Sequence, residues 1–114
     1  MECAAPFRIQ VERAHPRAGL RVSGELDIAT AGQLDDALGA LVGNGYRYLR
    51  LDLSSLSFMD VSGLQVLLRH QCAVTADRGL LILASPGRAV RLLLAVTGAD
   101  RVLLIDGAAA TTKY

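Results

Sequence analysis

Residues 80–98 read LLILASPGRAVRLLLAVTG, and this stretch contains a strand, a turn and a helix in succession. The run Leu80–Ala84 is continuously apolar, which is typical of a parallel strand that is covered on both faces in the middle of a sheet. Ser85-Pro86-Gly87 then opens a helix, and Gly98 closes it. The stretch therefore predicts a central parallel strand followed by a crossover helix.

The segments on either side of this stretch extend the same pattern. Two alternating apolar and polar runs, 7–13 and 20–26, are separated by turn-forming residues and predict an antiparallel hairpin. Thr30 stands three residues before Gln33, which is the spacing of a capping box at the start of a helix. The remaining expected elements are a strand over 48–53, a loop over 54–61, a helix over 62–76 and a last strand over 102–105.

This order, β-β-α-β-α-β-α-β, predicts the fold class. We expect an α/β protein with a mixed, mostly parallel β-sheet, an N-terminal hairpin and crossover helices. The sequence has 114 residues, a length that suits one compact domain spanning residues 1–114.

The charge of the chain argues against several classes of function. Twelve basic residues against eleven acidic ones leave a net charge of +1, which is too weak to attract a nucleic acid backbone directly. The only lysine is Lys113, so a phosphate-binding loop lysine and a Schiff-base lysine are excluded from the rest of the chain.

The cysteines and histidines predict no metal site. Cys3 and Cys72 form no spaced pair, and His15 and His70 are scattered, so neither a zinc site nor a disulfide framework is expected. No apolar stretch approaches the length of a membrane span, so we expect no membrane insertion. These features favour a cytoplasmic protein that needs no cofactor.

Polar residues follow three of the expected strands. Parallel strands end at the same edge of a sheet, so the loops that leave them are expected to meet there. The residues predicted at this edge are Asp27 and Thr30, then Asp60 and Ser62, then Ser85 and Arg88.

No histidine or lysine is placed to act as an acid or base partner of these residues, so no catalytic residue is predicted and an enzyme is not expected.

Ser62 allows two compatible interpretations. With Gln65 three residues later, it has the spacing of a capping box at the start of a helix. Alternatively, its hydroxyl is a phosphate acceptor at an exposed helix N-terminus, where backbone N–H groups and the helix dipole tolerate a phosphate. Asp60 is expected to cap the same turn, or to help a kinase recognise the hydroxyl.

Three other side chains are interpreted as structural. His70 falls in the middle of a helix and is expected at the helix surface. Cys72 is interpreted as a small core residue. Phe58 is expected, together with Met59, to be buried between sheet and helix.

With these residues the sequence resembles the STAS-domain anti-sigma factor antagonists, a bacterial family also called anti-anti-sigma factors. The resemblance spans nearly the whole chain, and its parts are specific in their order and spacing. They are SGELD at 23–27 followed by Thr30, LSFMDVSGL at 56–64, and the strand 79–83 leading through Ser85-Pro86 into VRL at 90–92.

The resemblance implies a regulatory role. Family members bind a cytoplasmic anti-sigma factor that is also a serine kinase, and thereby release a sigma factor. The resemblance implies that Ser62 is the phosphorylated residue and that phosphorylation switches binding off, while a serine phosphatase restores it. The surface facing the partner is then expected to include Asp27, Thr30, Asp60, Ser62, Gly63, Ser85 and Arg88.

Two alternatives remain open from the sequence. One is a STAS accessory subunit of a membrane transport system that lacks a phospho-switch, which copurification with a permease and an ATPase would favour. The other concerns assembly, because the segment after the last strand is short for the final helix of the family. A homodimer, in which the partner completes the last packing layer, is one way to fill that space.

Overall fold

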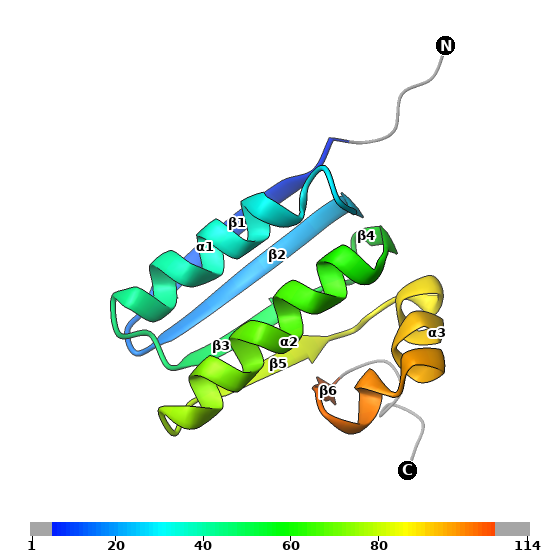
Figure 1. The fold of residues 1–114 in the computed structure, drawn as a ribbon. Helices are drawn as coiled ribbons and strands as arrows, with labels where there is room; N and C mark the ends of the chain where they lie inside the picture. The colour runs from blue at the N-terminus through cyan, green and yellow to red at the C-terminus, as the bar shows by residue number, and fades with distance from the viewer. Residues whose placement is uncertain (1–5, 107–114) are drawn as a thin grey trace.

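The protein forms a six-stranded sheet with helices, and the computed structural model describes residues 6–106 (Figure 1). Cys3 and the segment after Asp106 lie outside the described residues. The strands are β1 (Arg8–Ala14), β2 (Arg17–Leu26), β3 (Tyr48–Asp52), β4 (Leu56–Met59), β5 (Leu80–Ala84) and β6 (Leu104–Asp106). The helices are α1 (Ala31–Gly43), α2 (Val61–Ala76) and α3 (Arg88–Thr97), followed by a short 3-10 turn (Ala99–Arg101).

The pairing of the strands confirms a mixed sheet that begins with a hairpin. β1 and β2 are antiparallel, whereas β2, β3, β5 and β6 pair in parallel in the order β1-β2-β3-β5-β6. Helices connect the parallel neighbours, as crossover connections require. The predicted fold class is therefore confirmed.

β4 was not predicted, because its residues were expected to belong to a loop over 54–61. It pairs in parallel with the second half of β2, beyond the part that pairs with β3, so β2 has two successive neighbours on the same side. The register shifts between Gly24 and Glu25, and Gly24 has a φ of 94° that favours glycine. In β4 only the first and last residues, Leu56 and Met59, are buried, so the segment lacks the alternation that marks a strand.

The hydrophobic core lies between the sheet and the helices. Figure 1 shows α1 and α2 side by side across one face of the sheet, while α3 stands at one end, where it packs against β4. The core is built mainly from leucines that are less than 2% exposed. They are Leu20, Leu26, Leu34, Leu38, Leu49, Leu51, Leu53, Leu67, Leu81, Leu83 and Leu94.

The opposite face of the sheet is open, which corrects the prediction for β5. Leu81 and Leu83 are buried beneath the helices, but Leu80 points the other way and is 38% exposed. β5 is fourth of the five strands in the row, with β3 and not β5 at the centre. The apolar run of β5 is continuous because Leu81 and Leu83 face the core while Leu80 and Ile82 form an apolar patch on the open face. A continuous apolar run therefore does not require that both faces are covered.

Candidate functional site

Asp60 lies between β4 and α2 in the chain, and its hydrogen bonds join the end of β2 to the start of α2. Its backbone N–H donates to the Leu26 carbonyl oxygen at 3.0 Å, and its Oδ1 accepts from the N–H groups of Ser62 at 2.8 Å and Gly63 at 3.3 Å. Asp60 is thus the N-cap of α2, as predicted. The capping-box interpretation of Ser62 is wrong, because α2 begins at Val61 and Ser62 is its second residue.

Ser62 presents a hydroxyl group at the first turn of α2. The residue is half-buried, and its Oγ takes part in no hydrogen bond within residues 6–106. Its backbone N–H is already bound by the Asp60 carboxylate, so the hydroxyl lies beside a negative charge at a helix N-terminus. A group attached to this oxygen would therefore meet both the helix dipole and the Asp60 carboxylate.

Gly63 is buried and lets α2 approach β2 closely. A Cβ at this position would lie 2.5 Å from Cγ of Leu26 and 3.1 Å from Cγ of Met59. These distances are too short for a side chain in a packed interior. Gly63 therefore fixes where the start of α2, including Ser62, sits against the sheet.

The loop after β2 is held by Asp27 and Thr30. Asp27 Oδ1 accepts from the Ala29 N–H at 2.9 Å and the Thr30 N–H at 3.2 Å. The Thr30 hydroxyl donates to the Glu25 carbonyl oxygen at 2.8 Å and accepts from the Asp27 N–H at 3.0 Å. Asp27 thus caps the loop with its carboxylate, but the capping box expected at Thr30 does not form, because the Thr30 hydroxyl points back to the loop.

The predicted residues meet at one edge of the sheet in two groups. The bond between Asp60 and Leu26 brings Asp27–Thr30 next to Asp60–Gly63, and we call these two segments the Ser62 edge. Ser85 and Arg88 follow β5 at the same end of the sheet (Figure 1). Within the described residues, no hydrogen bond or ion pair joins Ser85 or Arg88 to Asp27, Asp60 or Ser62.

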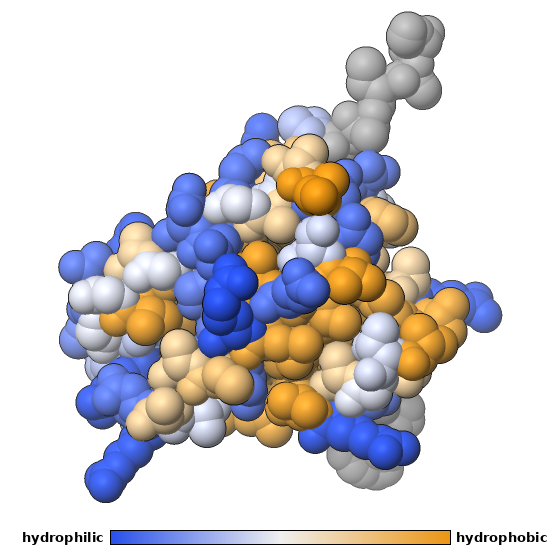
Figure 2. Space-filling view, viewed as in Figure 1, coloured by the Kyte–Doolittle hydropathy of each residue, from blue (hydrophilic) through white to orange (hydrophobic). Residues whose placement is uncertain are grey.

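Sequence reasoning missed three apolar side chains around the Ser62 edge. Ile28 is 82% exposed, Phe58 45% and Val61 53%. The expectation that Phe58 is buried is wrong, since only Met59 faces the core. Figure 2 shows hydrophobic residues reaching the surface near the ends of β2 and β4. Exposed apolar groups beside polar ones are typical of a protein-binding surface.

A separate charged cluster lies between α1 and α2. Asp35 Oδ1 is 2.7 Å from Nε2 of His70 and 2.8 Å from the Arg69 guanidinium. Hydrogen bonds from Arg69 and His70 lower the pKa of Asp35 below its ordinary value. His70 is buried, so its predicted place at the helix surface is wrong, and the predicted core residue Cys72 is exposed.

Residues 6–106 contain neither a cluster of metal ligands nor a membrane-spanning helix. No group of three or more His, Cys, Asp or Glu side chains in residues 6–106 is arranged to hold a metal ion. None of the helices in that range combines the length and the apolar character needed to cross a membrane.

Sequence comparison identifies relatives of this fold. A family model described as "Mlab, STAS domain" matches residues 9–106. The anti-sigma-F factor antagonist RsfB of Mycobacterium tuberculosis is 38% identical over 50 residues. That match covers 44% of this chain and 41% of RsfB, so it spans less than half the length of the relative.

Solved structures show the same architecture. An anti-sigma factor antagonist from Mycobacterium paratuberculosis has a TM-score of 0.81 and 29% identity, over 91% of this chain and 90% of that one. The antagonist SpoIIAA has a TM-score of 0.78 in its unphosphorylated form, with 24% identity over 91% and 90% of the two chains. The phosphorylated form of SpoIIAA, from Bacillus, has a TM-score of 0.73, with 24% identity over 91% and 94%.

Proposed function

This chain belongs to the STAS domain family, and we propose that it is an anti-sigma factor antagonist whose binding is switched off by phosphorylation of Ser62. In this proposal, the unphosphorylated protein binds a cytoplasmic anti-sigma factor that is also a serine kinase, and a sigma factor is released. A serine phosphatase restores binding. The protein itself has no catalytic activity and works through contact alone.

The observation that carries the proposal is the Ser62 hydroxyl. It lies at the first turn of α2 without a hydrogen-bonding partner among residues 6–106, so a kinase does not have to break a structural bond to reach it. In the neighbouring loop, by contrast, the Thr30 hydroxyl is fixed by the Glu25 carbonyl. This contrast favours Ser62 over Thr30 as the modified residue.

The surroundings of Ser62 supply both a binding surface and a way to abolish binding. Ile28, Phe58 and Val61 offer apolar area to a partner, while Asp27 and Asp60 contribute negative charge. A phosphate adds about −1.5 to −2 charges at neutral pH and carries a tightly held shell of water. Placed among these carboxylates, it concentrates negative charge on the surface, and a partner that covers this surface must remove water from the phosphate.

The size of this effect suffices for a switch without refolding. A loss of about 3 kcal/mol in binding free energy lowers affinity by roughly a hundredfold. The fold itself tolerates the phosphate, because the helix dipole stabilises negative charge at the start of α2. The relatives support this proposal to the extent that RsfB and SpoIIAA are anti-sigma factor antagonists, and SpoIIAA is known in a phosphorylated form.

The experiment is partner capture from a lysate of the source cell, with three baits compared side by side. The baits are the wild-type protein, Ser62→Asp, and Ser55→Asp as a matched control in the exposed turn before β4. We expect wild type and Ser55→Asp to enrich a small ATP-binding kinase, and Ser62→Asp to lose it. Purified kinase should phosphorylate wild type but not Ser62→Ala, and Ser62→Ala should bind constitutively.

The proposal fails if the Ser62→Asp protein, folded by circular dichroism, captures the same kinase as wild type. It also fails if the kinase modifies Ser62→Ala as efficiently as wild type. Either result would leave Ser62 with no role in a switch.

A second candidate function is that of an accessory subunit in a membrane transport system. The observation in its favour is the outer side of α3, where Leu92 is 64% exposed and Val96 71%. Both residues belong to α3, whereas Ser62 belongs to α2. Such a side could dock on a larger complex without a phospho-switch. Capture of a permease and an ATPase by wild type and Ser62→Asp alike would favour this role.

A further inference from the structure

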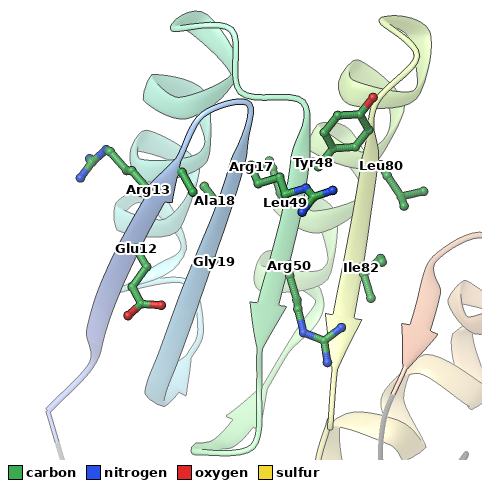
Figure 3. A pocket seen from close by; sticks show the side chains of 11 residues that line it. Glu12, Arg13, Arg17, Ala18, Gly19, Tyr48, Leu49, Arg50, Leu80 and Ile82 are labelled. Carbon is green, nitrogen blue, oxygen red and sulfur yellow. The ribbon is translucent and has the colours of Figure 1, made fainter.

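The open face of the sheet contains a hollow of about 540 Å³ (Figure 3). We call it the Gly19 hollow, and its walls include Glu12, Arg17, Gly19, Tyr48, Leu80 and Ile82. Tyr48 and Leu80 are the first residues of β3 and β5, so the hollow lies toward the opposite end of these strands from the Ser62 edge. The surface is therefore separate from the one proposed to bind an anti-sigma factor.

The hollow exists because Gly19 has no side chain. Across the sheet, the register places Glu12, Gly19, Arg50 and Ile82 in one row on the open face. A Cβ at Gly19 would meet no atom within 4 Å, so the space above it is empty. The φ of Gly19 is not positive, so the backbone does not require a glycine at this position.

One side of the hollow is apolar. Tyr48 is 40% exposed and Leu80 38%; the two are paired across β3 and β5, and Ile82 follows Leu80 by two residues on the same face. Figure 3 shows these three side chains along β3 and β5, with nothing standing on β2 at Gly19. Pockets for small molecules are lined mainly by apolar groups and range over roughly 300–1,000 Å³, so the volume and lining suit a small ligand.

The charges on this face indicate what kind of ligand fits. Arg21 is 3.4 Å from the Asp52 carboxylate, and Arg50 is 2.8 Å from that of Asp106. Arg17 differs, because no carboxylate within residues 6–106 forms an ion pair with it. In Figure 3 its guanidinium group leans over β3 beside Tyr48, whereas the Glu12 carboxylate points away along β1. The hollow thus offers a cation next to its apolar side.

A second copy of the chain fits this face poorly. Arg17 and Arg21 flank Gly19 along β2 on the same face. Two copies packed face to face about Gly19 would place these arginines against one another. Like charges brought together in an interface are repelled and desolvated, so an anionic occupant is favoured over a second copy.

We propose that the Gly19 hollow binds a small amphipathic carboxylate. Its carboxylate group pairs with Arg17, and its aliphatic body lies above Gly19 against Tyr48, Leu80 and Ile82. Glu12, on the other side of Gly19, repels the carboxylate and so sets the direction in which the ligand lies. This site goes beyond the proposed function, and it needs neither Ser62 nor an anti-sigma factor.

The test is a titration of the full-length protein with sodium octanoate, below its critical micelle concentration, followed by two-dimensional ¹H–¹⁵N NMR. Octan-1-ol is the neutral control probe. We expect octanoate to give saturable shifts at the amides of Gly19, Leu49 and Ile82, and octan-1-ol to bind more weakly.

Three variants separate the parts of the proposal. Gly19→Leu fills the hollow and should abolish the shifts, while its thermal stability is no lower than that of wild type and its capture of the kinase stays unchanged. Arg17→Gln should weaken binding by up to about fivefold, the usual range for an exposed ion pair. Glu12→Gln should strengthen octanoate binding by about twofold, because the substitution removes the repulsion between the carboxylates of Glu12 and the ligand. Arg91→Gln, in α3, is the matched arginine control and should change nothing.

Several outcomes would overturn the proposal. Absent shifts at the three amides, or shifts that persist unchanged in Gly19→Leu, would show that the hollow is not a binding site. Equal binding of octan-1-ol and octanoate, or an unaffected Arg17→Gln, would remove the assigned role of the carboxylate. None of these results bears on Ser62, so the two proposals fail independently.

Discussion

The two faces of the sheet are filled to very different degrees. On the helix side, Leu20, Leu51 and Leu83 are no more than 1% exposed. On the same side, at the start of α2, a Cβ added to Gly63 would lie 2.5 Å from Cγ of Leu26. On the open side, a Cβ added to Gly19 would meet nothing within 4 Å. The helix side therefore carries the stability of the fold, and the open side can vary for binding at little cost.

The largest expected difference between the two faces is found within β5. Leu83→Ala creates a cavity under the helices and should lower the free energy of unfolding by about 2–5 kcal/mol. Ile82→Ala, one residue earlier on the open face, should cost about 1 kcal/mol, because its side chain is only half-buried. Urea denaturation of both variants measures the two values. Equal losses would mean that the open face is covered in solution.

Gly63 and Gly19 should respond to the same substitution with opposite signs. Gly63→Ala forces Leu26 and Met59 to move, which should cost about 1–3 kcal/mol of stability. Gly19→Ala should stabilise the protein by about 0.5 kcal/mol, because alanine loses less backbone entropy in a strand. Thermal unfolding of the pair checks both signs. A neutral Gly63→Ala would contradict the close packing of α2 on β2.

Much of this arrangement could be predicted from the sequence. The alternating runs before residue 27 indicated the β1–β2 hairpin, and the turn residues after each strand placed Asp27 and Asp60 at a common edge. These features are local, since they depend on periodicity and on the residues that follow a strand. The choice between Asp60 and Ser62 as the cap was harder, because both residue types cap helices and the end of β4 decides between them.

Features that depend on distant segments could not be predicted. The apolar run of β5 does not tell whether helices cover one face or two, so Leu80 was expected to be buried. β4 exists because the second half of β2 offers it a free edge, and its own four residues do not alternate. The Gly19 hollow likewise depends on neighbours in four strands, which no local pattern connects.

The smallest expected effects on stability concern two carboxylates, one on each side of the sheet. Between the helices, Asp35 bonds to Arg69 and to His70, which is 35 positions away in the sequence. On the open face, Asp52 accepts from the Ser54 hydroxyl and N–H and pairs with Arg21. The pKa of Asp35 is lowered chiefly by Arg69 and His70, and the pKa of Asp52 chiefly by Ser54.

Both shifts predict a loss of stability in acid. A folded-state pKa below the unfolded value stabilises the protein above the unfolded pKa, and this contribution disappears as pH falls through the folded pKa. Asp35→Asn and Asp52→Asn should therefore be less stable than wild type at pH 7, and the differences should shrink as the pH falls below the ordinary aspartate pKa of 3.8 toward the lowered folded-state pKa. Urea denaturation from pH 7 downward measures this, with the exposed Asp100→Asn as the control. A deficit of Asp35→Asn that did not shrink as the wild-type carboxylate was titrated in acid would mean that the carboxylate charge is irrelevant and that the packing of α1 on α2 was altered instead.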